Sequence, residues 1–204
     1  MIVLTEGKTD SRLLSKAIQI THPHLVDFIK FIEFEKVPAE PSVSALVRTV
    51  YAFIAAGVAN RFVAIADNDA AANETLDKIK KDRRIPDTCR ITHYPEIPLL
   101  ASYPTIEPNS KIENLANING HAGSLEMYFG RDALTMDGKL VPIRWKNYNA
   151  NSGKYHGGLS KQDKHRVQQT FETKMGHALR GEKTDVMDWS GIHAIIEHII
   201  HAFD

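Results

Sequence analysis

The first half of the chain alternates between short apolar runs and longer amphipathic stretches. The runs with the composition of strands are Ile2–Leu4, Asp27–Glu35, Arg61–Ala66 and Arg90–Tyr94. The stretches with a helical period are Ser11–Ile20, a segment that begins at the capping residue Ser42 and ends near Gly57, and Ala71–Arg84. Because strands and helices take turns along the chain, the pattern predicts an α/β fold with a mainly parallel sheet flanked by helices.

The second half of the chain has a less regular pattern. Its expected elements are a long connection over Pro95–Pro108, a short helix at Ser124–Phe129, an edge strand at Leu140–Trp145, a loop over Asn147–Gly158, and helices at Ser160–Leu179 and Trp189–Phe203. Thr9 or Asp10 is expected to cap the first helix, and Gly7 to permit a tight turn before it. We therefore predict an α/β core over residues 1–110 and a C-terminal helical elaboration over residues 111–204, together forming one compact domain.

Composition narrows the classes of protein to which the chain can belong. The 25 basic residues balance the 25 acidic ones, so any contact with nucleic acid depends on a local basic patch. The single cysteine, Cys89, favours a reducing cytoplasmic compartment over a disulfide framework. The first residues lack the basic and apolar regions of a signal peptide, and no apolar stretch approaches the length that spans a membrane. The sequence therefore does not predict a membrane partner.

Carboxylates follow two of the expected strands. Glu6 comes after Ile2–Leu4, and Asp67 and Asp69 come after Arg61–Ala66. The carboxyl ends of parallel strands meet at one edge of a sheet, and Mg²⁺ prefers oxygen ligands. The pattern predicts a Mg²⁺ or Mn²⁺ site, with Asp10 as a further ligand. The alternative is that Asp10 is a helix cap and that either aspartate of the pair is a turn residue.

These acids lie in two motifs of a known family. The segments Leu-Thr-Glu-Gly-Lys-Thr-Asp and Ile-Ala-Asp-Asn-Asp resemble the TOPRIM domain of topoisomerases, primases, ribosomal RNA maturases and OLD-family (overcoming lysogenization defect) nucleases. Glu6, Asp67 and Asp69 match the family's conserved acids, and Asp10 makes the chain most similar to the OLD branch. The resemblance implies a compact TOPRIM-like α/β sheet and Mg²⁺-dependent cleavage or joining of nucleic-acid strands.

The OLD branch also has a downstream segment whose acid serves a second metal ion. Gly123-Ser124-Leu125-Glu126 is similar to it, so the resemblance implies that Glu126 is a metal ligand. A later lysine assists the reaction in that branch, and Lys164 suits this role best, with Lys161 and Lys154 as alternatives. The implied reaction is two-metal hydrolysis of a phosphodiester bond, in which Glu6, Asp67 and Lys164 are catalytic. No tyrosine can be assigned as a nucleophile, which favours hydrolysis over strand passage.

Substrate contacts are expected mainly from the second half of the chain. The candidates are Lys8, Ser124, Arg144, Lys154, Lys161 and Arg166. Trp145, Tyr148 and Tyr155 are interleaved with the basic residues and are candidates for stacking on unpaired bases. The alternative is that the charges form a solvated face and the aromatic rings are packed against the protein.

Three other interpretations of the chain remain open. The first is a non-catalytic TOPRIM module that binds a partner ATPase or nucleic acid; the second is a receiver-like or phosphatase-like domain. A role as a toxin or phage-defence effector concerns the biology more than the chemistry. Gly7-Lys8-Thr9 resembles the end of a Walker A loop, but Ile2 replaces its first glycine, so an ATPase partner would be a separate chain. Oligomerisation is possible, and a zinc site built from His193, His198 and His201 is disfavoured.

Overall fold

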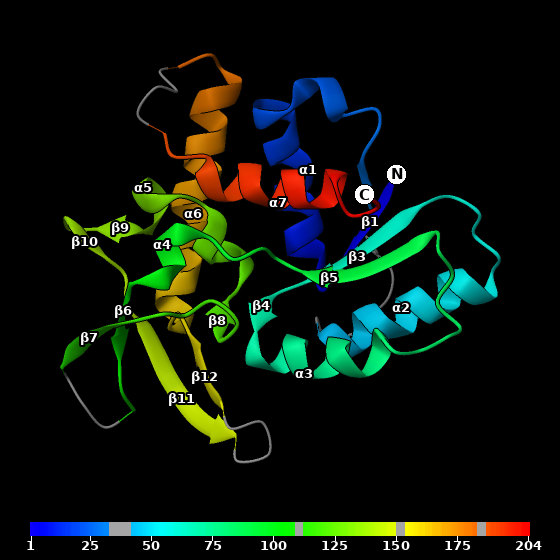
Figure 1. Cartoon of the computed structure of the whole chain (residues 1–204). Helices are drawn as coiled ribbons and strands as arrows, with labels where there is room; N and C mark the ends of the chain where they lie inside the picture. Colours follow the sequence, from blue (N-terminus) through cyan, green and yellow to red (C-terminus); the bar gives the residue numbers. More distant parts are fainter. Residues whose placement is uncertain (33–41, 109–111, 150–153, 183–186) are drawn as a thin grey trace. The chain divides into compact units, whose positions relative to one another are not determined.

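The protein divides into two compact units in its computed structural model (Figure 1). The structure describes all residues except 33–41, 109–111, 150–153 and 183–186, and for residues 147–149 and 154 it describes the backbone alone. Unit 1 consists of Met1–Asp67, Ala71–Tyr94 and Ile196–Asp204, and unit 2 consists of Asn68–Ala70 and Pro95–Ile195. The predicted division after residue 110 falls within unit 2.

Unit 1 is built on a parallel four-stranded sheet with the order β2-β1-β3-β5. The strands are β1 (Ile2–Thr5), β2 (Lys30–Phe31), β3 (Phe62–Ala66) and β5 (Cys89–His93), and the helices are α1 (Lys8–Thr21), η1 (Pro23–Leu25), α2 (Val43–Ala55) and α3 (Ala70–Ile79). The helix α1 leads from β1 to β2, whereas α3 leads from β3 to β5 in the opposite direction across the sheet. The strand order therefore reverses between β1 and β3, and such switch points are where open α/β sheets place their sites.

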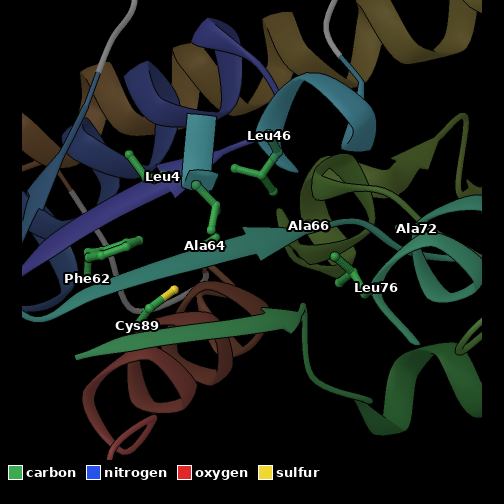
Figure 2. Close-up of a cluster of buried hydrophobic side chains, with 9 residues drawn as sticks. Leu4, Leu46, Phe62, Ala64, Ala66, Ala72, Leu76 and Cys89 are labelled. Atoms are coloured by element: carbon green, nitrogen blue, oxygen red, sulfur yellow. The ribbon is translucent and has the colours of Figure 1, made fainter. Parts of the chain in front are cut away.

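One hydrophobic cluster holds α2 and α3 against the sheet (Figure 2). Its buried members are Leu4, Phe62, Ala64, Ala66 and Cys89 from the strands, with Leu46 and Val50 from α2 and Ala72 and Leu76 from α3. Every residue of β3 is buried, which explains why this strand is apolar throughout its length. The prediction of a mainly parallel sheet flanked by helices is confirmed for this unit.

In unit 1, the start of α1 differs from the prediction, whereas the start of α2 agrees with it. Helix α1 begins at Lys8 with Gly7 as its N-cap, and no side chain caps it, so the predicted capping by Thr9 or Asp10 is wrong. The Gly7 backbone is extended (φ −139°), a conformation open to any residue. Ser42 does cap α2, because its hydroxyl accepts a hydrogen bond from the Ala45 N–H at 3.2 Å. Of the predicted strand 27–35, residues 33–35 lie outside the described part of the structure. Within residues 27–32, the strand is β2 (Lys30–Phe31).

Unit 2 contains a second four-stranded sheet, with the order β12-β11-β6-β7. Its strands are β6 (Tyr103–Ile106), β7 (Glu113–Ala116), β11 (Ile143–Asn149) and β12 (Lys154–Gly158). The other elements are β4 (Asn68–Asp69), α4 (Pro98–Ala101), β8 (Ala122–Gly123), η2 (Leu125–Tyr128), α5 (Arg131–Leu134), β9 (Thr135–Met136), β10 (Lys139–Leu140), α6 (Lys161–Leu179) and α7 (Ser190–Ile200), of which α7 ends in unit 1. No helix in the described part of the chain is long and apolar enough to cross a membrane.

The described structure of unit 2 corrects four expectations. The elaboration is not mainly helical, the connection Pro95–Pro108 contains α4 and β6, and the segment 147–158 contributes to two paired strands instead of a loop. Strand β11 lies between β12 and β6, so Leu140–Trp145 does not form an edge strand. The asparagines and glycines of this hairpin have low strand propensity, but pairing with a neighbouring strand outweighs it. Gly157 also has a packing role, because a Cβ atom there would lie 2.7 Å from Cε3 of Trp145.

Candidate functional site

Glu6 and Asp67 meet at the switch point of the unit 1 sheet. Strands β1 and β3 pair in register up to Thr5 and Ile65, so the residues that follow them leave the sheet side by side. Oε1 of Glu6 accepts a hydrogen bond from the backbone N–H of Asp67 at 2.9 Å. The structure thereby brings together the first acid of each predicted motif, although they are 61 residues apart in the sequence.

The turn between β1 and α1 holds Glu6 in place through buried hydroxyl groups. Thr5 Oγ1 donates to the Gly7 carbonyl oxygen at 2.9 Å and lies 2.7 Å from Ser11 Oγ. Ser11 in turn donates to the carbonyl oxygen of Ile32 at 2.8 Å, which ties the turn to the segment after β2. Asp10 lies in the first turn of α1, where a negative charge is favourable near the helix N-terminus. Lys8, the first residue of the helix, is exposed.

Glu126 is the second acidic centre, and it belongs to unit 2. Its side chain is only 1% exposed, yet both carboxylate oxygens have donors. Ser124 Oγ lies 2.8 Å from Oε2, and Nε2 of Gln168 donates to Oε1 at 2.7 Å. The ammonium of Lys164 lies 3.2 Å from the same Oε1. These contacts neutralise and position a carboxylate that would otherwise be too costly to bury.

Helix α6 supplies two of these donors from adjacent turns. Lys164 and Gln168 are four residues apart, so they lie on the same face of the helix. Ser160 fixes the start of α6 by accepting a hydrogen bond from the Asp163 N–H at 3.1 Å, as the predicted helix Ser160–Leu179 requires. Lys164 is predicted from the sequence, whereas Gln168 is not. The only sequence signal for Gln168 is its spacing of four residues from Lys164, which places both side chains on one face of a helix.

Asp69 lies in unit 2, whereas Asp67 belongs to unit 1. Strand β4 pairs with β8 in antiparallel fashion, with Asp69 opposite Ala122 and Asn68 opposite Gly123. A Cβ atom on Gly123 would lie 2.8 Å from the Asn68 carbonyl oxygen, so only glycine allows this close approach. The glycine of the Gly-Ser-Leu-Glu segment therefore has a packing role, and it links the Asp-Asn-Asp motif to the strand that precedes Glu126.

Glu6, Asp67 and Glu126 have carboxylate oxygens, which are chemically suited to bind a metal ion. Glu6 and Asp67 offer carboxylates at the end of adjacent parallel strands, and the Lys164 ammonium already places a cation beside Glu126. Hard divalent cations prefer such oxygen ligands. Within the residues described, no group of three or more His, Cys, Asp or Glu side chains is arranged so that it could hold a metal ion. The candidates are Glu6 with Asp67 in unit 1 and Glu126 in unit 2, and neither is a group of three such side chains.

The predicted substrate-binding residues are distributed over unit 2 and α1. Arg144 on β11 and Lys161 and Arg166 on α6 are exposed. Ser124 binds Glu126, and Lys8 belongs to unit 1. The side chains of Lys154 and Tyr148 lie outside the described part of the structure, although their backbones belong to β12 and β11.

An aromatic cluster lies on the β11–β12 hairpin. The Trp145 ring is 6.2 Å from the Tyr155 ring and also 6.2 Å from the His121 ring, which it meets edge-on. Tyr155 is 50% exposed, so one face of this cluster is open to solvent. The rings therefore combine packing within the hairpin with an exposed aromatic surface.

His198 near the end of α7 and His201 just after it have structural partners in unit 1. His198 Nε2 lies 2.8 Å from the Thr92 hydroxyl, and burial, with a smaller effect of the His93 charge, lowers the His198 pKa. The hydrogen bond from His201 to Asp204 raises the His201 pKa, and Glu197 lies on the other side of that ring.

Comparisons with known proteins identify no relative of this chain. No family model matches it, and neither a curated protein nor a solved structure is detectably similar to it. The functional assignment therefore depends on the chain's own residues.

Proposed function

We propose that the protein is a Mg²⁺- or Mn²⁺-dependent nuclease of the TOPRIM type, most similar to the OLD branch, that hydrolyses phosphodiester bonds of DNA or RNA. The observation that carries the proposal is the hydrogen bond between Glu6 and the Asp67 backbone at the switch point of a parallel sheet. Both acids directly follow strands whose residues are mostly buried. Two such acids on adjacent strands are the arrangement that a cation-dependent site needs.

Each unit contributes its own residues to the proposed chemistry. In unit 1, Glu6 and Asp67 would hold one ion, and water molecules would complete its coordination. In unit 2, Glu126 would hold a second ion, with help from Asp69, and Lys164 would neutralise charge on the scissile phosphate. When bound, a divalent ion would supply charge stabilisation to the phosphate group of the substrate. The protein itself contributes the oxygen ligands, and Ser124 and Gln168 fix the carboxylate of Glu126.

The substrate and partners follow from the same assignment. The exposed basic residues of unit 2 and the aromatic cluster of the hairpin suit a single-stranded or locally unpaired nucleic acid. Cytoplasmic defence or repair, with a separate ATPase subunit, is the biological setting that we propose. This setting follows the OLD branch, whose nuclease domain usually accompanies an ATPase.

Chelation and one isosteric substitution test the proposal directly. We expect the protein to cleave plasmid DNA, single-stranded DNA or RNA with Mg²⁺ or Mn²⁺, and EDTA to abolish this cleavage because the carboxylates alone supply no electrophile. Asp67→Asn keeps the backbone N–H that binds Glu6 and removes one charge. We expect it to lower the cleavage rate by roughly 100-fold. Equal cleavage by Asp67→Asn and the unaltered protein, measured on gels over time, would exclude this site.

A non-catalytic binding module is the second candidate, and one observation favours it. Both oxygens of Glu126 already have protein donors, as they would in a purely structural carboxylate. Such a module would bind nucleic acid or a partner ATPase without cutting. It predicts binding that is unaffected by EDTA and by Asp67→Asn, with no cleavage under any of the conditions above.

Nucleic-acid binding itself can be tested at the aromatic cluster. Tyr155→Ala removes an exposed ring, and we expect it to weaken binding of a single-stranded oligonucleotide about tenfold, because stacking on one aromatic ring contributes about 1–3 kcal/mol per base. Fluorescence anisotropy with a labelled oligonucleotide measures the effect. The matched control is Phe28→Ala, which removes an exposed ring from unit 1. An equal loss of affinity in both variants would show that the hairpin is not the binding surface.

A further inference from the structure

The contacts of Glu126 differ in how easily each can be given up. A carboxylate has about four acceptor positions, and here Ser124, Gln168 and Lys164 occupy three of them. Ser124 is the N-cap residue of η2, two residues from Glu126 in the chain, and Gln168 makes the short 2.7 Å contact. Lys164 makes the longest contact, and its side chain is 50% exposed, against 1% for Glu126. Lys164 is therefore the donor that can move into solvent without exposing the carboxylate.

The Lys164 ammonium is also the donor that matches a metal ion in charge. A buried carboxylate requires a nearby cation, because an isolated negative charge is costly in a low-dielectric environment. Ser124 and Gln168 offer dipoles alone, so in this structure Lys164 supplies the compensating charge. A divalent cation at Oε1 would supply it instead.

We propose that Lys164 holds the place of a divalent cation at Glu126, and that it gives up Oε1 when the cation binds, while Ser124 and Gln168 keep the carboxylate in position. This inference rests on the proposed function, since it assumes that Glu126 is a metal ligand. The same inference gives the Lys164 ammonium a second binding position, away from Glu126. Once released from Glu126, the ammonium on α6 is available for a phosphate group, as the proposed mechanism requires. Metal binding and the positioning of the lysine are then one coupled event.

Mn²⁺ binding to the full chain tests this exchange without any nuclease assay. Lys164→Met removes the competing charge and keeps the length of the side chain. We expect it to tighten Mn²⁺ binding about tenfold, equivalent to about 1.4 kcal/mol, as measured by the loss of the free Mn²⁺ signal in electron paramagnetic resonance. Lys139→Met removes an exposed lysine on β10 of the same unit and should leave the affinity unchanged. Glu126→Gln combined with Lys164→Met should cancel the gain. Unchanged or weaker Mn²⁺ binding by Lys164→Met would overturn the inference.

A measurement on the unaltered protein covers the case in which the variant folds poorly. The ¹⁵N-labelled lysine ammonium group of Lys164 should give a side-chain NMR signal that shifts as diamagnetic Mg²⁺ is added, and the Lys161 signal should not shift. A Lys164 signal that stays constant up to saturating Mg²⁺ contradicts the exchange. Cleavage without this exchange would support the proposed nuclease function and overturn the inference about Lys164. Exchange without cleavage would support a cation position at Glu126 and overturn the nuclease assignment.

Discussion

Glu6→Gln should lower the rate of Mg²⁺-dependent cleavage by roughly 10³-fold while leaving the fold intact. The substitution keeps an oxygen atom that can accept the hydrogen bond from the Asp67 N–H at the same position. It removes only the negative charge, which is the property that a divalent cation requires. A loss of this size in an otherwise unchanged structure would therefore identify Glu6 as a functional ligand, and it would exclude a purely structural role in joining β1 to β3.

The control for this prediction is Glu113→Gln on the exposed edge strand β7. It changes the net charge by the same amount at a position that plays no part in the proposed site, so its cleavage rate should stay within twofold of the unaltered protein. Circular dichroism and thermal melting of both variants separate an effect on folding from an effect on chemistry. If Glu6→Gln and Glu113→Gln cleave at equal rates, Glu6 is not a metal ligand and the nuclease assignment fails.

The second large effect is expected on stability, at a buried lysine of unit 2. The Lys174 side chain is 5% exposed, and its ammonium donates to the Phe129 carbonyl oxygen at 2.9 Å, to Asp132 Oδ1 at 2.8 Å and to the Asp188 carbonyl oxygen. It also lies 4.4 Å from the centre of the Trp189 ring. Burial lowers the Lys174 pKa, and the hydrogen bond to Asp132 opposes this effect. One ammonium thus connects α6 with the residue before the N-cap of α5, with α5 itself and with the segment before α7.

Lys174→Met should lower the free energy of unfolding of unit 2 by about 3 kcal/mol, because it leaves the Asp132 carboxylate and two carbonyl oxygens without their donor. Both tryptophans of the chain lie in unit 2, so tryptophan fluorescence during urea denaturation reports on this unit. Lys161→Met is the matched control, since it removes an exposed lysine from the same helix. A Lys174→Met midpoint equal to that of Lys161→Met would show that the buried ammonium contributes nothing to stability.

Much of unit 1 follows from local pattern alone. The apolar run of β3 and the capping hydroxyl of Ser42 are signals carried by neighbouring residues, and the structure confirms both. The acids at the ends of β1 and β3 were identified because parallel strands share one carboxyl edge, a rule that needs no coordinates. The pairing of Glu6 with the Asp67 backbone agrees with that expectation.

The wrong predictions concern one pair of strands and one helix end. The sequence predicts a loop over Asn147–Gly158 because the asparagines and glycines there have low strand propensity, but propensity describes a residue without its neighbours across the sheet, and β11 and β12 pair. The N-terminus of α1 was misjudged because capping side chains are only one way to satisfy a helix end. Local signals do not contain this information.

Local sequence is enough to predict the alternation of strands and helices, the buried character of β3 and the positions of the acids along the chain, because each depends on the period and chemistry of adjacent residues. The folded chain adds that the strand order reverses between β1 and β3, that a second sheet forms in unit 2, and that Gln168 and Lys164 share one buried carboxylate. These features arise from contacts between residues far apart in the chain. Their free energy depends on burial and geometry that no single segment of sequence specifies.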